Sequence, residues 1–442
     1  MMDLKDKRLL ILGGNPLSIE IVKAAQKMGV YTIVTDWYDT KRSPAKLVAD
    51  EYWNEEIFKP ERISQLIKER HIDGVITGFT DSYLLQYCTI CELSGLPCYS
   101  TRAIFEKTLN KSEFKKLCRE NEIPVVPDFD LEEFNPDIIS KDNIILIKPV
   151  DNSGSRGIVT CDDSKQFKKC LDYALSFSEK KQVVIEKYIN MDSFSVSYTI
   201  QDGVISMSTM NDRVVHRVAG AGAVTNGGIY PSKYIDSYMK KMDMKVRAMY
   251  KNLGVKNGVL FIQGFTNGYS YYFYEMGYRL SGGCHFLYTE NQNNSSSASQ
   301  LVHFALTGKM ADYKIIERDD PKFHDLCFQW NILGKEGVIS RIEGFDTISN
   351  LPEVIHSTIN KHVGSRIGKD GTTMQKIAGF HAIVNNLEQM KRLVQYMYDH
   401  FQVFDENGRN MVMDTVYELD NMLSDNQLYS YYAKDSDFIR SK

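Results

Sequence analysis

The chain has 442 residues, of which 43% are hydrophobic and 25% are charged, and its formal net charge is -4. This composition is that of a folded globular protein, and the length predicts about two to four domains. The 53 basic and 57 acidic side chains are too evenly balanced to predict a surface for nucleic acid. No apolar run is long enough for a signal peptide or a membrane span, so we expect a cytoplasmic protein with no membrane partner.

Strands and helices alternate along the first part of the chain. Apolar runs that read as buried strands are followed by segments whose apolar residues recur at helical spacing. The strands are expected at 7–14, 30–36 and 73–79, and the helices at 18–29, 61–71 and 83–95. Strands separated by helices predict a parallel α/β sheet with right-handed crossovers.

The first turn of this region invites comparison with a dinucleotide-binding loop. A GxGxxG pattern that starts at Gly13 would need glycine where Asn15 and Ser18 stand. Asp36 does end the second strand, where an acid that binds ribose would lie. Because two of the three glycines are missing, NAD binding through this region is only a minor alternative.

Cysteine usage is that of a reduced compartment. Cys88 and Cys91 form a single CxxC within a helical pattern, Cys98 follows closely, and no second CxxC exists. We therefore interpret these residues as buried free thiols rather than zinc ligands.

From residue 106 the pattern changes to hairpins with helices, which is typical of an α+β nucleotide-binding unit. One hairpin covers 193–210 and turns at Asp202-Gly203, and another covers 259–279 and turns at Asn267-Gly268. The glycine-rich segment 211–232 is interpreted either as a loop that covers a substrate or as an ordinary surface loop. A third region at 311–425 contains a strand and a long helix near its end, and 426–442 is a polar tail.

The stretch IKPVDNSGSRGI, residues 147–158, places a lysine beside a loop of small residues. Backbone N–H groups of Gly154, Ser155 and Gly157 could crowd an anion, and Lys148 would add charge. The simpler reading is a surface hairpin with a turn-rich tip. Lys111, which begins a helix, and Glu186, which ends a strand, are further candidates for a nucleotide site. Glu275 and Arg279 lie at the end of the last hairpin and could hold Mg²⁺ and offset transferred charge.

In this order the motifs resemble those of the ATP-grasp fold. The biotin-carboxylase-like and carbamoyl-phosphate-synthase-like branches, which include the L-amino acid ligases, are the most similar by pattern. The resemblance implies a Rossmann-like domain at 1–105, an ATP-grasp domain at 106–310 with a mobile lid at about 135–190, and a C-terminal α+β cap at 311–425.

The resemblance also implies roles for individual residues. Lys111 and Lys148 would contact the ATP phosphates, which Gly154, Ser155 and Gly157 would cover. Glu275 and Gln263 would be the ligands of Mg²⁺, for which Mn²⁺ could substitute, and Arg279 would stabilise transferred charge. The adenine pocket would be lined by Glu186, Lys187, Tyr188 and Ile189.

Two residues depart from the family pattern. Gln263 stands where relatives usually have a second metal-binding carboxylate, and Gly277 stands where they usually have asparagine. A glutamine oxygen can ligate Mg²⁺ but brings no charge, so a second metal ion would bind more weakly than the first.

The resemblance implies an ATP-dependent carboxylate–amine ligase that works through an acyl phosphate and releases ADP and phosphate. Its substrates would be a small carboxylic acid and an amine, with amino acids as one candidate class, and a homodimer is compatible with it. The alternative, which the two departures favour, is an ATP-binding protein with degraded catalysis that acts as a regulatory subunit.

Overall fold

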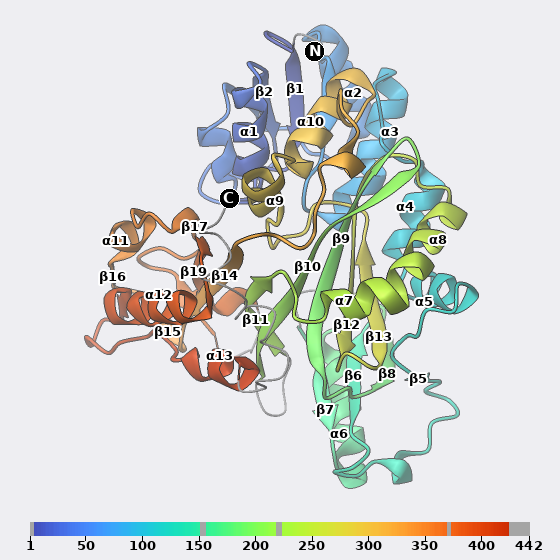
Figure 1. The fold of residues 1–442 in the computed structure, drawn as a ribbon, viewed down its shortest axis with the longest axis vertical. Helices are drawn as coiled ribbons and strands as arrows, with labels where there is room; N and C mark the ends of the chain where they lie inside the picture. Colours follow the sequence, from blue (N-terminus) through green and yellow to red (C-terminus); the bar gives the residue numbers. More distant parts are fainter. Residues whose placement is uncertain (1–3, 151–155, 218–222, 369–372, 424–442) are drawn as a thin grey trace, which may run out of the picture.

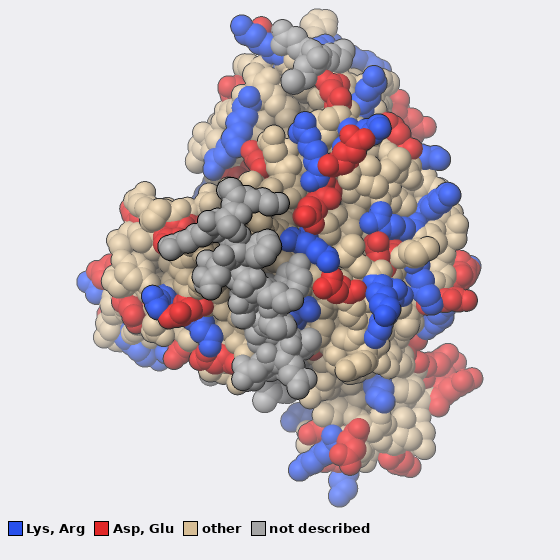
Figure 2. Space-filling model, viewed as in Figure 1, with Lys and Arg blue, Asp and Glu red and all other residues tan. Residues whose placement is uncertain are grey.

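The computed structural model describes residues 4–150, 156–217, 223–368 and 373–423. The predicted loop residues Gly154 and Ser155 and the predicted tail 426–442 lie outside these ranges. No helix within them combines the length and the apolar character needed to cross a bilayer. In the view of Figure 2, acidic and basic side chains are interspersed over the surface.

The first part of the chain forms a four-stranded parallel sheet in the order β3-β2-β1-β4, as the alternation of strands and helices predicts. The strands are β1 (Arg8–Leu12), β2 (Tyr31–Thr35), β3 (Glu51–Trp53) and β4 (Gly74–Ile76). The helices are α1 (Ser18–Lys27), α2 (Pro60–Glu69) and α3 (Leu84–Ser94). All of Leu9 to Leu12 are buried, because helices cover both faces of such a sheet. Cys88 and Cys91 are buried in α3, as expected for structural thiols.

A helix from much later in the chain completes this first domain. α10 (Ser297–Thr307) packs against α1 and β4, and Figure 1 shows it beside the first sheet. Its buried residues and those of the first sheet belong to one hydrophobic core. The stability of the first domain therefore depends on a segment about 200 residues away from it in sequence.

A small second sheet forms the part of the chain predicted to be a lid. α4 (Arg102–Leu109) and α5 (Lys111–Glu120) lead into it, and its strand order is β5-β8-β6-β7. The strands are β5 (Asp128–Phe129), β6 (Ile145–Pro149), β7 (Val159–Cys161) and β8 (Val183–Lys187), and α6 (Phe167–Ser176) packs on them. This sheet and α6 have a small hydrophobic core of their own, separate from the main core.

The central sheet has eight antiparallel strands in the order β13-β12-β9-β10-β11-β14-β19-β17. They are β9 (Asp192–Gln201), β10 (Val204–Arg217), β11 (Ala223–Tyr230), β12 (Gly258–Thr266), β13 (Tyr271–Gly277), β14 (Leu326–Leu333), β17 (Val354–Ile359) and β19 (Lys376–Val384). Along β9, apolar side chains such as Phe194 and Tyr198 alternate with Ser193, Ser195 and Ser197. The apolar face packs on α7 (Ile235–Tyr238) and α8 (Met244–Leu253), which leaves the opposite face polar.

Both predicted hairpins are present. Asp202 and Gly203 have φ values of 51° and 82°, as a two-residue turn between twisted antiparallel strands requires. The prediction of a loop at 211–232 was wrong for most of its length, because residues 211–217 belong to β10 and 223–230 form β11. The glycines there allow close strand approach: a Cβ at Gly227 would lie 2.5 Å from the carbonyl oxygen of Gln329 on β14.

The predicted cap extends the central sheet rather than forming a separate one. β14, β19 and β17 continue it beyond β11, and α12 (Leu387–His400) covers them over a second hydrophobic core. The remaining elements are α9 (Phe286–Asn293), β15 (Gly337–Val338), β16 (Arg341–Glu343), α11 (Phe345–Ser349), β18 (Arg366–Ile367), β20 (Gln402–Phe404) and α13 (Val416–Leu423). The division of the chain at residue 310 stays a prediction, since the sheet runs across it.

The contact between β4 and α10 predicts that Gly74→Ala destabilises the protein. The added Cβ would lie 2.4 Å from the carbonyl oxygen of Ala305, a main-chain atom that cannot move aside alone. We expect a loss of about 2 kcal/mol in the free energy of unfolding, measured by denaturant titration. The matched control is Gly282→Ala, whose Cβ would make only an ordinary 3.6 Å contact with Leu17. Equal stabilities of the two variants would contradict this packing.

Candidate functional site

Two lysines meet on one buried glutamate between the lid and the central sheet. The Lys115 ammonium lies 2.7 Å from Oε1 of Glu186, and the Lys148 ammonium lies 2.6 Å from Oε2. Lys115 comes from α5, Lys148 from the end of β6 and Glu186 from β8, which pairs with β6. Both carboxylate oxygens of Glu186 are thus engaged, and the side chain is only 5% exposed.

This cluster holds an excess of buried positive charge. Burial opposes ionisation of Glu186, but the charges and hydrogen bonds of Lys148 and Lys115 outweigh it and hold the pKa of Glu186 below its ordinary range. Lys115 also lies 3.2 Å from the carboxylate of Asp128, which is one-third exposed. Two ammonium groups around one deeply buried carboxylate form a site to which an anion such as phosphate would be attracted.

Main-chain hydrogen bonds connect the cluster to the last hairpin. Lys115 donates to the carbonyl of Val126, and the N–H of Val126 donates to the carbonyl of Phe273 on β13. The N–H of Phe273 in turn donates to the carbonyl of Pro124. Lys115 is therefore connected to the strand that carries Glu275, two residues beyond Phe273.

Gln263 and Glu275 lie directly opposite each other on β12 and β13, so their side chains share the polar face. The Gln263 side-chain oxygen accepts hydrogen bonds from the Arg213 guanidinium at 3.2 Å and from the Tyr274 hydroxyl at 3.1 Å. No hydrogen bond or ion pair engages the Glu275 carboxylate within the described part of the chain. Of the two predicted metal ligands, only Glu275 is open.

The absence of asparagine at position 277 has a steric cause. Gly277 lies opposite Phe261 in the β12–β13 ladder, and a Cβ at Gly277 would lie 2.4 Å from the Phe261 ring. The Arg279 guanidinium lies over the same ring, 5.1 Å from its centroid. Phe261 therefore fills the space that a longer side chain at position 277 would need.

Arg279 forms a two-pronged ion pair with Asp81 of the first domain. Its Nε and Nη2 atoms each lie 2.6 Å from one oxygen of the Asp81 carboxylate. Asp81 follows β4, at the carboxyl edge of the parallel sheet where open α/β sheets place ligands. The Arg279 side chain is 14% exposed and that of Asp81 is 45% exposed. The pair joins the first domain to the end of the last hairpin.

The other predicted residues are less central or differently placed. Lys111 begins α5, one turn before Lys115, and its contact with phosphate stays a prediction. Lys187 is exposed and Ile189 is buried, while the N–H of Lys187 donates to Pro127 and that of Tyr188 to Ile144. Gly157 has a φ of 75°, and a Cβ there would clash with Phe177 and Pro149, so the fold requires glycine at this position. Its contact with phosphate stays a prediction.

Lys115 is the residue that sequence reasoning missed. The signal was available in the run KSEFK, where Lys111 and Lys115 are four residues apart and so share one face of a helix. Arg213, the other missed residue, meets Gln263 only through tertiary structure.

A scan against family models matches residues 109–283 to the model described as the ATP-grasp domain. Residues 109–283 are an ATP-grasp domain. The match spans the two lysines, the lid, the last hairpin and Arg279.

Curated relatives match over the same part of the chain. The chain is 30% identical over 199 residues to a formate-dependent phosphoribosylglycinamide formyltransferase of Sulfurisphaera tokodaii. The matched region covers 42% of this chain and 48% of the relative. The enzyme of the same name from Bacillus subtilis is 22% identical over 203 residues, which covers 45% of this chain and 52% of that one. The chain thus spans about half the length of the curated relatives it matches.

Solved structures extend the likeness in fold to nearly the whole chain. An L-amino acid ligase from Bacillus licheniformis has a TM-score of 0.73 at 16% identity, with 91% of this chain and 99% of that chain covered. A phosphoribosylglycinamide synthetase from Anaerococcus prevotii has a TM-score of 0.70 at 17% identity, with 91% and 100% covered. The ATP-grasp domain therefore lies within a larger architecture that these proteins share.

The residues of the ATP-grasp domain fit one divalent metal ion better than two. An open carboxylate at Glu275 is a suitable ligand for Mg²⁺, which takes its remaining ligands from phosphate oxygens and water. The Gln263 oxygen does not fit, because Arg213 and Tyr274 already use it. The described residues hold no group of three or more His, Cys, Asp and Glu that could bind a metal ion without a nucleotide.

The first domain does not offer the ribose contact that NAD binding would need. The Asp36 carboxylate is buried and accepts hydrogen bonds from the N–H of Gly14 at 2.9 Å and the Ser43 hydroxyl at 2.5 Å. Asp36 therefore stabilises the turn after β1, which weakens the NAD alternative.

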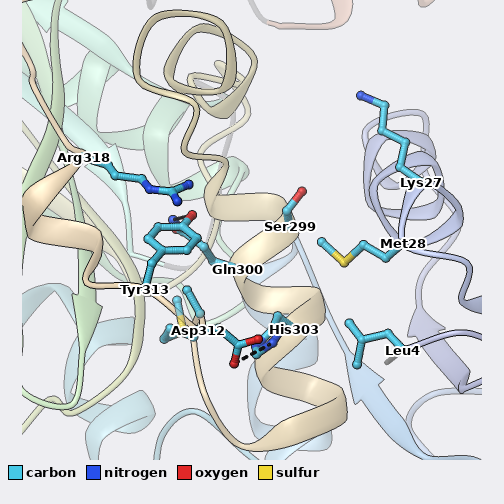
Figure 3. Close-up of a pocket in the computed structure, with 11 residues that line it drawn as sticks. Leu4, Lys27, Met28, Ser299, Gln300, His303, Asp312, Tyr313 and Arg318 are labelled. Atoms are coloured by element: carbon cyan, nitrogen blue, oxygen red, sulfur yellow. Dashed lines mark hydrogen bonds and ion pairs between the residues drawn. The ribbon is translucent and has the colours of Figure 1, made fainter. Parts of the chain in front are cut away.

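A cavity of about 750 Å³ lies elsewhere, between the first domain and the segment after α10 (Figure 3). Leu4 and Met28 line one side, and on the other the Arg318 guanidinium lies 3.5 Å from the centroid of the Tyr313 ring. The residues that line this cavity include none of the lysines or carboxylates described above, so we do not assign the nucleotide to it.

The buried cluster predicts that Glu186→Gln destabilises the protein by about 3 kcal/mol at neutral pH, because Lys148 loses its carboxylate partner and Lys115 keeps only the partly exposed Asp128. Chemical denaturation would measure the change. The control Asp172→Asn removes an exposed ion pair with Lys168 and should cost less than about 0.5 kcal/mol.

The same substitution has a defined pH dependence. Because the pKa of Glu186 is lowered on folding, its contribution is present above the ordinary value of 4.5 and is lost as the pH falls through the lower folded value. The stability difference between wild type and Glu186→Gln should therefore shrink in acid. A difference that stays constant from neutral to acid pH would show that Glu186 is not ionised in the cluster.

Proposed function

We propose that this protein is an ATP-dependent carboxylate–amine ligase. An oxygen of the substrate carboxylate attacks the γ-phosphorus of Mg-ATP, the bond to ADP breaks, and an acyl phosphate forms. The nitrogen of an amine then attacks the acyl carbon, phosphate leaves, and the nitrogen loses a proton. The product is an amide or peptide bond.

The buried pairing of Lys115 and Lys148 with Glu186, next to the hairpin that carries the open Glu275 carboxylate, is the observation that carries this proposal. The two ammonium groups would hold the phosphates of ATP, with Lys111 at the first turn of the same helix as Lys115. The open carboxylate of Glu275 would hold Mg²⁺, which would offset the negative charge of the phosphates. Glu186 would keep the two lysines in place while Lys187, Tyr188 and Ile189 line the adenine.

Arg279 supports acyl transfer in particular. Its fork already grips a carboxylate, that of Asp81, with two short hydrogen bonds. The same geometry binds a substrate carboxylate or the oxygens of an acyl phosphate. If the substrate takes the place of Asp81, the freed aspartate can attract the ammonium form of the second substrate.

The lid, at about residues 135–190, would close over ATP. Its small separate core lets it move without disturbing the central sheet. Closure excludes water, which protects the acyl phosphate from hydrolysis until the amine arrives.

Small molecules are the proposed substrates, and amino acids are one candidate class for both acid and amine. The likeness in fold to an L-amino acid ligase supports this choice. The cofactors are ATP and Mg²⁺, with Mn²⁺ as a substitute, and a cytoplasmic location and a homodimer are part of the proposal.

The second candidate is an ATP-binding regulatory subunit with degraded catalysis. The engaged oxygen of Gln263 and the glycine at position 277 favour it. It predicts tight ATP binding without turnover, whereas the ligase turns over when both substrates are present.

An ADP-release assay across a panel of carboxylic acids and amines tests the ligase directly. We expect release that needs both an acid and an amine, with mass spectrometry showing an amide. ADP release with no dependence on either, or ATP binding with no release across the panel, would favour the regulatory candidate.

Removal of a phosphate-binding lysine should weaken nucleotide binding. Lys148→Ala should reduce the affinity for Mg-ATP by about 30-fold, since a charge-assisted contact contributes about 2 kcal/mol. Isothermal titration calorimetry measures this, and Lys141→Ala, an exposed lysine of the same region, is the matched control. Identical affinities of the two variants would place the phosphates elsewhere.

A further inference from the structure

Arg213 lies on the polar face of the central sheet beside the predicted metal ligands. On β10 it pairs in register with Ser193 of β9, which in turn pairs with Phe265 of β12. Gln263 is two residues from Phe265 and points to the same face, within diagonal reach of a long side chain. The Arg213 guanidinium crosses β9 to meet it.

Only neutral groups hold this guanidinium. Its Nη1 donates to Gln263 Oε1 at 3.2 Å, to Ser193 Oγ at 3.3 Å and to the Tyr274 hydroxyl, and its Nη2 donates to Thr225 Oγ1 at 2.6 Å. Within the described ranges, no carboxylate forms an ion pair with it. A half-buried guanidinium fixed by four neutral partners carries uncompensated positive charge into the cleft.

Lys376 lies close enough to Arg213 for their charges to interact. Burial lowers the pKa of Lys376, at the start of β19, and the positive charge of Arg213 lowers it further, to about 8. Two cations held near each other without a carboxylate between them are stabilised when an anion binds. The field of this part of the cleft therefore suits an anionic ligand and opposes a further metal ion.

The amide of Gln263 cannot serve a metal ion and Arg213 at once. A divalent ion needs a lone pair of its oxygen, and both the Arg213 guanidinium and the Tyr274 hydroxyl already donate there. An ion at that position would also lie against a fixed positive charge, which raises its free energy. Glu275, opposite Gln263, has neither obstacle.

We propose that the Arg213 guanidinium takes the place of a second metal ion, so that the nucleotide binds with one Mg²⁺ on Glu275 and Arg213 supplies the other positive charge beside the triphosphate. This rests on the proposed nucleotide site. In this arrangement Gln263 positions the Arg213 guanidinium through a hydrogen bond and is not a metal ligand. This role explains why a neutral amide stands at position 263. A carboxylate at position 263 would pair with Arg213 unless that charge were also removed.

Electron paramagnetic resonance with Mn²⁺ as the probe tests this, because free Mn²⁺ is counted directly. With one equivalent of the non-hydrolysable analogue AMP-PNP, wild type should bind one Mn²⁺ per chain. Gln263→Glu should still bind one, because its carboxylate pairs with Arg213. The double variant Gln263→Glu/Arg213→Met should bind two. Arg247→Met, which removes an arginine paired with Asp243 elsewhere, is the charge-matched control and should bind one.

Each result decides between the alternatives. The role of Arg213 would be overturned if wild type bound two Mn²⁺. It would also be overturned if the double variant bound only one, provided that this variant melts as a folded protein and binds AMP-PNP. The number of Mn²⁺ ions bound by wild type tests the proposal even if a variant fails to fold. Calorimetry with Mg-AMP-PNP separates the two levels of the account: no nucleotide binding overturns the proposed function together with this inference, whereas tight binding with two metal ions overturns this inference alone.

Discussion

The whole site depends on the buried contact of two lysines with one glutamate. Lys115 belongs to the helix that leads into the lid, whereas Lys148 and Glu186 belong to two strands of the lid sheet. Burial of three charges is unfavourable unless each is compensated, so these elements are held in a single arrangement. Lys115 also donates to the carbonyl of Val126, whose N–H donates to Phe273 on β13, so the cluster is connected to the strand that carries Glu275.

The other end of the cleft is fixed by a second charge pair. Arg279 and Asp81 are 198 residues apart in sequence and join the last hairpin to the carboxyl edge of the first sheet. The shared core of α10 and the first sheet reinforces this contact. The candidate site therefore draws its residues from three regions of the chain.

Local signals were enough to predict much of the architecture. The alternation of strands and helices, the turns at Asp202-Gly203 and Asn267-Gly268, and the strand ends at Lys148 and Glu186 all follow from periodicity and turn chemistry. Lys115 shares a helical face with Lys111, so its role was within reach of the sequence.

The remaining features depend on tertiary contacts that no local pattern carries. The pairing of Asp81 with Arg279 joins distant segments. The glycines of 211–232 indicated a loop, but they serve close strand packing, and this misreading concealed Arg213 inside β10. Gly277 departs from the family pattern, and the Phe261 ring opposite it leaves no room for a side chain there. Likewise, Gln263 seemed a weak metal ligand until its bond to Arg213 was visible.

The most direct test of the central claim is a crystal structure of the complex with AMP-PNP and Mg²⁺. The account predicts the triphosphate between the Lys148 ammonium and the Glu275 carboxylate, with the adenine against β8. A nucleotide bound at the Gly13-Gly14 turn of the first domain, or in the cavity beside Tyr313, would contradict it.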